Sequence, residues 1–313
     1  MPDLGALLAT FERDLDCAHP EANAHGVSII GYGEVSVAMS LRDAPGKVLK
    51  RMPAFVSLDE AERYARVIHR YLGILGSIGV AVIPTETIAV TGHGAYSLYV
   101  VQDRVAPENL GQNILKDGTD AALLALVGAV QDSVERFVAF SDASRDGRTL
   151  AIDTQISNWA WLPGEGGKDR AVLIDVSTPF MRLNGAEETG LDVYLRGLPR
   201  FLRWPFRRLR VVEEYIDDYF EPRLTMLDLL GNFHKEGRPD RIPLVLDCAN
   251  AWLARQSWKH DSRPIATADI DAYYKSDAGL LELVMKIRRC DRFVVTRILR
   301  RPYNYVLPGK IAR

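Results

Sequence analysis

The first third of the chain alternates short apolar runs with turn residues, a pattern typical of antiparallel strands. Five such runs are expected to be strands: Val27 to Ile30, Val35 to Leu41, Lys47 to Met52, Glu86 to Val90 and Tyr96 to Val101. Between the first two lies Gly31-Tyr32-Gly33, which we interpret as a turn. The pattern therefore predicts a small antiparallel sheet.

A helix is predicted between the third and fourth strands. Apolar residues recur at helical spacing from Leu58 to Leu75, and Ser57 with Glu60 forms the sequence of an N-terminal capping box. A further helix is expected at the start of the chain, from Leu4 to about Asp16. Residues 1–102 are thus expected to form an N-terminal lobe, a sheet with one main helix.

From Asp120 onward the apolar spacing becomes mainly helical. The predicted helices are Asp120 to Phe140, Leu191 to Leu198, Val211 to Tyr219, Leu224 to Asn232, Ile242 to Ala254, Ala268 to Tyr274 and Leu280 to Phe293. A hairpin interrupts them, with strands at Ser157 to Leu162 and Arg170 to Asp175 around a glycine-rich turn. The chain is therefore expected to be an α+β protein of two lobes, 1–102 and 103–313, hinged near Gln102 to Pro107.

Composition narrows the functional classes. The 313 residues carry a net charge of -2 and a pI near 6.3, which gives no general reason to expect a nucleic-acid partner. The three cysteines are far apart and form no zinc or disulfide pattern. The start of the chain lacks the features of a signal peptide, and the most apolar window, Tyr71 to Ile83, is too short to span a bilayer. We expect a soluble cytoplasmic protein with free thiols and no membrane span.

The clearest candidate chemistry lies between Asp153 and Asp175. Asn158 follows Asp153 by five positions, and Asp175 ends the second hairpin strand. A phosphoryl-transfer site needs one carboxylate to orient the attacking hydroxyl, and an asparagine and a second carboxylate to hold Mg²⁺. Asp and Asn also favour turns and caps, so a purely structural role is the alternative.

These motifs, in this order, resemble the protein-kinase-like superfamily, specifically its branch of aminoglycoside phosphotransferases and choline kinases. The resemblance covers roughly Val27 to Asp175. It implies a two-lobed kinase-like fold that binds ATP and Mg²⁺ in the cleft and phosphorylates a hydroxyl of a small molecule. The implied roles are a phosphate-covering loop at Gly31 and Gly33, a phosphate-binding lysine at Lys50, a catalytic aspartate at Asp153 and metal ligands at Asn158 and Asp175.

The same resemblance assigns two further positions in the N-terminal lobe and leaves a choice between two lysines. Lys47 competes with Lys50 for the phosphate-binding role, and we prefer Lys50 because it lies deeper in its apolar strand. A helix carboxylate is expected to hold this lysine, and Glu62 is preferred to Glu60 because Glu60 has a capping role. Gln102, where the fifth strand ends, is expected at the adenine-binding hinge.

Departures from the family pattern support a second hypothesis. Ser36 replaces the third glycine of the loop, and Ala151 replaces the usual histidine two residues before the catalytic aspartate. A nucleotide-binding pseudokinase with a regulatory role is therefore the alternative function. A kinase for protein substrates is a weaker third hypothesis, because Asp175-Val176-Ser177 is not followed by a recognisable activation segment.

An arginine cluster surrounds Trp204-Pro205-Phe206. Its members are Arg200, Arg203, Arg207, Arg208 and Arg210. We interpret it first as a solvated helix face or as salt bridges to the acidic residues Glu213, Glu214, Asp217 and Asp218. The alternatives are an anionic substrate or a membrane surface. Tyr215 and Tyr219, with the same acidic residues, are in turn candidates for a cationic substrate pocket.

Overall fold

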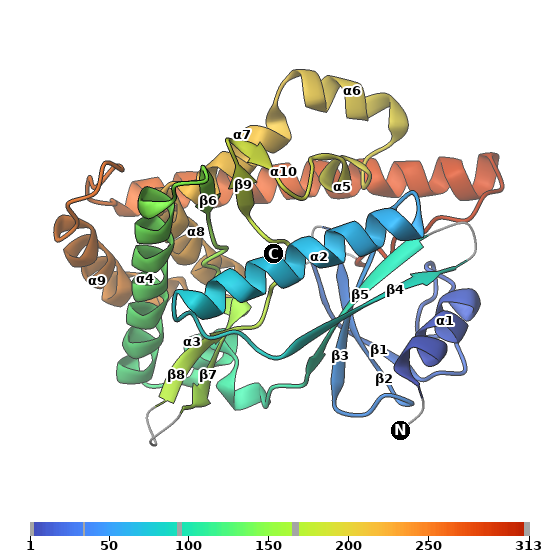
Figure 1. Cartoon of the computed structure of the whole chain (residues 1–313), viewed down its shortest axis with the longest axis horizontal. Coiled ribbons are helices and arrows are strands. Elements are labelled where there is room, and N and C mark those ends of the chain that lie inside the picture. The colour runs from blue at the N-terminus through green and yellow to red at the C-terminus, as the bar shows by residue number, and fades with distance from the viewer. Residues whose placement is uncertain (1–2, 34, 93–95, 165–168, 310–313) are drawn as a thin grey trace.

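The computed structural model describes residues 3–33, 35–92, 96–164 and 169–309 and confirms a mixed α+β architecture. Its main sheet has five antiparallel strands in the order β1-β2-β3-β5-β4. The strands are β1 Val27–Tyr32, β2 Val37–Leu41, β3 Lys47–Phe55, β4 Thr85–Thr91 and β5 Tyr96–Asp103. All five predicted strands are thus observed, and they form one side of the molecule in Figure 1, with most helices on the other side.

Helix α2, Leu58–Ser77, covers one face of this sheet (Figure 1). The Ser57 hydroxyl accepts a hydrogen bond from the Glu60 N–H at 3.1 Å, and the Glu60 carboxylate accepts one from the Val56 N–H at 2.8 Å. These bonds satisfy backbone donors at the helix start that have no partner within the helix. The buried face of α2 consists of Ala61, Tyr64, Ile68, Tyr71 and Leu75.

A second helix, α1 at Leu4–Asp14, packs on the opposite face of the sheet. Its side chains Leu8 and Phe11 share a buried cluster with Leu49 and Tyr99, whereas α2 packs on residues that point to the other side of the same strands. The helix expected from Leu4 to about Asp16 is therefore confirmed, but the sheet carries two helices where one was expected. The sheet has apolar side chains on both faces, so both must be covered.

The remainder of the chain is mainly helical, as predicted. Its helices are α3 Gly111–Asp117, α4 Asp120–Ala143, α5 Asp192–Leu195, α6 Arg200–Arg208, α7 Val211–Asp217, α8 Pro222–Lys235, α9 Ile242–Ala254 and α10 Thr267–Phe293. The two helices expected between Ala268 and Phe293 are one continuous helix, α10, which packs along α8. Gly279 does not end it, because an internal glycine costs only about 1 kcal/mol, which packing readily offsets.

The predicted hairpin is present as β7, Trp159–Pro163, and β8, Asp169–Leu173. The first strand begins later than expected because residues 156–158 form a 3₁₀ turn, and the turn residues 165–168 lie outside the described part of the chain. A second small sheet pairs β6, Arg148–Leu150, with β9, Met181–Leu183, and β10, Ala186–Glu187.

One buried apolar cluster extends from the α2 face of the sheet into the helical half. At its centre the ring of Tyr71 in α2 stacks on Phe137 of α4, with 6.4 Å between ring centroids. The segment after α10 returns to the sheet, where Val306 joins the cluster under α1 (Figure 1). Within the described ranges, none of the helices is long and apolar enough to cross a membrane.

Candidate active site between the sheet and the helical half

A cavity of about 630 Å³ lies between the five-stranded sheet and the helical half of the molecule. Its volume lies in the range of small-molecule sites. Seven of the eight residues assigned from the sequence line it: Gly31, Gly33, Lys50, Gln102, Asp153, Asn158 and Asp175. They come from positions as far apart as β1 and the segment after β8, so the fold gathers them in one place.

Lys50 of β3 reaches across this cavity. Its Nζ donates to the Ile174 carbonyl at 2.9 Å and lies 3.0 Å from Oδ1 of Asp175. Lys47 instead pairs with Asp103 at 2.7 Å at the far end of the strand. The structure therefore places Lys50, the preferred of the two lysines, in the cavity.

The Asp175 carboxylate is held in a fixed orientation. Its Oδ1 accepts hydrogen bonds from the Ser177 N–H at 3.1 Å and the Ser177 hydroxyl at 2.7 Å, in addition to the contact with Lys50. Burial raises the pKa of Asp175, but the Lys50 charge and the Ser177 hydrogen bonds outweigh it and hold that pKa below its usual range. The carboxylate is therefore ionised at neutral pH.

The oxygen atoms of Asp175 and Asn158 decide whether the cavity suits a cation such as Mg²⁺. Among the described residues, the contacts of Asp175 all involve Oδ1, so Oδ2 is open to a ligand. Asn158 lines the same cavity and supplies a second hard oxygen donor, the kind Mg²⁺ prefers. The described ranges contain no group of three or more His, Cys, Asp or Glu side chains that could hold a metal ion by themselves. The donors thus fit an ion that also binds phosphate oxygens and water.

The loop that carries Asp153 is tied down on both sides. Before it, the Ala151 N–H donates to the Phe180 carbonyl at 3.0 Å; after it, the Thr154 hydroxyl donates to the Thr225 carbonyl at 2.5 Å. Asp153 Oδ1 itself accepts the Gln155 N–H at 3.0 Å. The Asp153 side chain is thereby presented to the cavity by a rigid backbone.

Helix α2 aligns the two acidic segments with each other. The hydroxyl of Tyr71 donates to the Ala151 carbonyl at 2.8 Å, and that of Tyr64, two turns earlier, donates to the Ser177 carbonyl at 3.0 Å. Both tyrosines are fully buried on one face of the helix. A single rigid element therefore sets the separation between the Asp153 loop and the Asp175 segment.

The glycine turn and Gln102 form the sheet side of the cavity. The Gly33 N–H donates to the Ser36 carbonyl at 2.9 Å, and a Cβ at Gly33 would lie 3.0 Å from the Ser36 hydroxyl oxygen. Gly31 lies in β1 at an irregularity in the pairing with β2, so the turn is shorter than expected. Gln102 is buried, and its amide donates to the Thr85 hydroxyl at 3.0 Å.

The structure does not bring Glu62 to Lys50. Glu62 lies on the exposed side of α2, outside the cavity, whereas Glu60 binds the Arg196 guanidinium at 2.6 and 2.8 Å. The expectation that Glu62 is the partner of Lys50 is therefore wrong, because the carboxylate beside the Lys50 ammonium group belongs to Asp175. The helical periodicity already contained the signal: Ala61 and Tyr64 define the buried face, and residue 62 falls off it.

One acidic residue near the site, Asp228, is not part of any sequence motif. Asp228 of α8 is buried, and the amide of Gln155, two residues after Asp153, donates to it at 3.4 Å. Burial raises the pKa of Asp228 well above its usual range, and the charges of Asp153 and Asp277 add to the effect, opposed by Lys235. A buried carboxyl group with a perturbed pKa next to Asp153 extends the site into the helical half.

This raised pKa predicts a pH-dependent stability. A carboxyl whose pKa is higher in the folded state favours folding below its unfolded pKa, and this contribution is lost as pH rises through the folded pKa. We expect Asp228→Asn to be more stable than the wild type at neutral pH, with the difference disappearing towards about pH 4. Urea unfolding across this range, with Asp247→Asn on the exposed face of α9 as control, measures it. A difference that is the same at every pH would contradict it.

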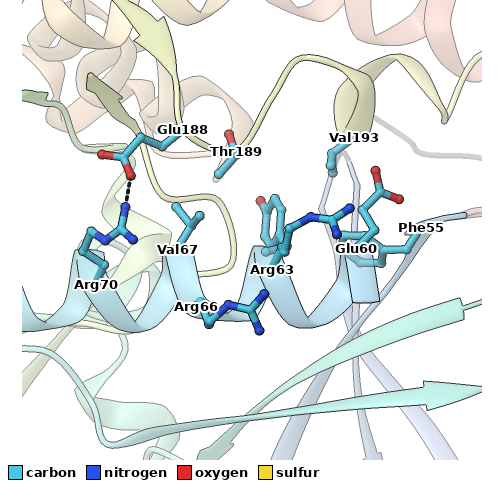
Figure 2. Close-up of a pocket in the computed structure, with 10 residues that line it drawn as sticks. Phe55, Glu60, Arg63, Arg66, Val67, Arg70, Glu188, Thr189 and Val193 are labelled. Carbon is cyan, nitrogen blue, oxygen red and sulfur yellow. Dashed lines mark hydrogen bonds and ion pairs between the residues drawn. The ribbon is translucent and has the colours of Figure 1, made fainter. Parts of the chain in front are cut away.

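A second cavity, of about 360 Å³, lies between α2 and the segment that carries Glu188 and Val193. Figure 2 shows Arg63, Arg66 and Arg70 along the helix below a segment that carries Glu188, with Arg70 and Glu188 joined as an ion pair. None of the eight assigned residues lines this cavity, and its charged groups join α2 to the segment before α5. We assign it a structural role.

The chain belongs to the family of unknown function DUF6206, which matches residues 12–292. Among curated proteins, no sequence matches the chain. Among solved structures, it is similar to one described as "WaaP in complex with acyl carrier protein", with 17% identity, 72% of this chain and 84% of that chain covered, and a TM-score of 0.32. A likeness this distant does not assign an activity, so function has to be inferred from the cavity itself.

Proposed function

We propose that this chain is an ATP- and Mg²⁺-dependent phosphotransferase that phosphorylates a hydroxyl group of a small molecule. The supporting observation is the convergence of Lys50 of β3, Asp153 and Asn158 of the loop before β7, and Asp175 after β8 on one cavity, from three separate segments. In this proposal the sheet half and the helical half are the two lobes of a protein-kinase-like fold. The nucleotide lies between them.

Each side chain has a defined task in the proposed reaction. Lys50, held beside Asp175, neutralises phosphate charge, and the N–H groups of the glycine turn approach the phosphate oxygens. Asn158 and Asp175 hold Mg²⁺, which when bound neutralises charge on the phosphates. Asp153 orients the acceptor hydroxyl and takes its proton as the hydroxyl oxygen bonds to the γ-phosphorus and the bond from that phosphorus to the ADP oxygen breaks.

The acceptor side of the cavity suits a substrate that resembles an aminoglycoside. Asp153 and Asp277 contribute carboxylates there, and Tyr215 and Tyr219 contribute aromatic rings. Hydroxyl compounds with amino groups are cations at neutral pH and are attracted to such a lining. The acceptor proposed is therefore a polyhydroxyl or amino-alcohol compound with positive charge.

A nucleotide-binding pseudokinase is the second candidate. Ala151 is buried and contributes only backbone bonds to the Asp153 loop, and within the described residues no helix carboxylate contacts Lys50. Under this alternative the cavity binds nucleotide without turnover. ATP would then stabilise the protein, while substitution of Asp153 would have no effect on any activity.

Nucleotide binding is tested by thermal unfolding with ATP, in the presence and absence of Mg²⁺. At a concentration about 100 times its Kd, ATP should stabilise the wild type by about 2.7 kcal/mol. Lys50→Met and Asp175→Ala are expected to lose most of this gain, because each removes a contact to the phosphates or the cation. Lys47→Met, a lysine on the same strand outside the phosphate position, should keep it.

The same measurement distinguishes both nucleotide-binding candidates, the enzyme and the pseudokinase, from a cavity with only a structural role. No stabilisation of the wild type by ATP, together with identical behaviour of Asp175→Ala, would exclude both. Stabilisation by ATP, with or without consumption, retains the nucleotide site. Consumption of ATP with an acceptor then distinguishes the enzyme from the pseudokinase.

A further inference from the structure

Helix α6 exposes large apolar side chains to solvent. Among the described residues of this helix none is buried, and Phe201 and Trp204 are 76% and 72% exposed. Leu209, directly after the helix, is 68% exposed. In Figure 1 α6 stands away from the body of the molecule. Exposed apolar side chains gathered in this way mark an interaction surface rather than a folding contact.

The same helix is rich in arginine. Phe201 and Trp204 are three residues apart and share a face, which Arg200 and Arg208 flank. The salt bridges expected from the sequence are not formed within the described part of the chain. Arg207 pairs instead with Asp192, and Asp217 pairs with Arg182. Within the same described residues, Arg200, Arg208 and Arg210 form no ion pair with a carboxylate.

The end of α10 continues this surface. Arg288 of α10 donates to the Gly197 carbonyl at 3.0 Å, and Arg203 of α6 donates to the Leu198 carbonyl at 3.0 Å, so both helices contact the segment that joins α5 to α6. Beyond Asp291 the exposed apolar residues are Phe293, Val294, Ile298 and Leu299, and the exposed arginines are Arg297, Arg300 and Arg301. Apolar and cationic side chains thus occur together on α6 and on residues 293–301, which end α10 and continue past it. We call these residues, with those of α6, the α6–α10 surface.

We propose that the α6–α10 surface docks on a bilayer that contains anionic lipids. Trp, Phe and Leu enter the boundary between headgroups and acyl chains, while arginines bind phosphate groups beside them. The net charge of the whole chain is -2, so attraction to such a surface has to come from this local cluster. Exposed aromatic side chains flanked by Arg200 and Arg208 on one short helix are the combination that an interfacial helix presents to lipid headgroups, and an acidic protein is the competing occupant. The proposal does not depend on the phosphotransferase activity.

Vesicle sedimentation tests this docking with the full chain. The probes are vesicles of phosphatidylcholine alone and vesicles of phosphatidylcholine with an equal amount of phosphatidylglycerol, at about 0.1 M salt. The wild type is expected to bind the second and not the first. Arg200→Gln/Arg208→Gln should weaken binding about 25-fold, because each arginine near an anionic surface contributes a factor of about five. Phe201→Ser/Trp204→Ser should abolish it.

Matched controls separate this surface from general charge. Arg145→Gln/Arg255→Gln removes two exposed arginines at the ends of α4 and α9, far from α6 in Figure 1, and should bind like the wild type. Equal binding to both kinds of vesicle, or unchanged binding of the aromatic variant, would overturn the proposal. Binding of poly-L-glutamate without binding of anionic vesicles would also overturn it and would assign the surface to an acidic protein.

Discussion

Replacing Asp153 by Asn is expected to lower phosphoryl transfer by about 100- to 10,000-fold while leaving ATP binding intact. The amide cannot accept the acceptor's proton, but its oxygen can still accept the Gln155 N–H hydrogen bond that Asp153 accepts at 3.0 Å. The loop is also held by the backbone and side-chain bonds of Ala151 and Thr154, so its course should not change. The substitution is therefore expected to remove the proton acceptor without changing the conformation of the loop.

The measurement is ATP consumption in a screen of aminoglycosides, nucleosides, sugars, amino alcohols and peptides, followed by kinetics with the best acceptor. Asp169→Asn, at the exposed start of β8, is the matched control and should be fully active. Equal losses of turnover, ATP binding and stability in Asp153→Asn would indicate a structural residue. An active wild type with a fully active Asp153→Asn would assign the proton transfer to another group.

Glu12→Ala is expected to destabilise the fold by roughly 3–5 kcal/mol, because it leaves the Arg51 guanidinium buried without its counter-ion. The Glu12 and Arg51 side chains are each only 2% exposed. Arg51 Nη2 and Nε donate to the Glu12 carboxylate at 2.5 and 2.9 Å, and Tyr99 and Ser97 donate to it at 2.5 and 2.8 Å. Every partner of this carboxylate would lose a hydrogen bond in the variant.

Urea unfolding measures this loss, with Glu282→Ala as control. Glu282 forms an exposed pair with Lys286 in α10 at 2.7 Å, and its removal should leave the midpoint unchanged. The double variant Glu12→Leu/Arg51→Met should be less destabilised than Glu12→Ala, because no charge is left buried. A midpoint for Glu12→Ala close to that of Glu282→Ala would show that the pair contributes nothing.

The pH dependence of the same pair has a defined sign. Burial raises the pKa of Glu12, but the charge of Arg51 and the hydrogen bonds of Arg51, Tyr99 and Ser97 outweigh it and lower that pKa. A carboxyl group whose pKa is lowered in the folded state stabilises the fold at pH values above its unfolded-state pKa. This stabilisation is lost as pH falls through its folded-state pKa.

The Glu12–Arg51 network joins α1 to the sheet and, through the hydrogen bond from Arg51 Nη1 to the Asn304 carbonyl at 2.6 Å, to the segment after α10.

Several features were predictable because their determinants are local. The Ser57 cap, the apolar face of α2 and the hairpin strands β7 and β8 each depend on residues a few positions apart. The spacing of Asp153, Asn158 and Asp175 is likewise local, because a single hairpin joins them. Such patterns reflect hydrogen bonding and burial within one element or between neighbours in the chain.

Other features depend on contacts between distant segments. Lys50 meets Asp175, and Arg51 meets Glu12, only because separate elements pack together. Asp228 lies in a helix without any motif, and its perturbed pKa results from burial and from charges on other elements. No local pattern contains the distance between such residues.

The sequence by itself determined an α+β chain with a β-rich first third, and it selected the residues around Asp153 as the candidate chemistry. Tertiary structure alone decided that Lys50 contacts Asp175 while Glu62 is exposed, that a second helix covers the sheet, and that α6 projects its aromatic residues outward. The physical reason is that element type follows from local burial and backbone bonding. Partners and exposure follow from which faces meet when the elements pack.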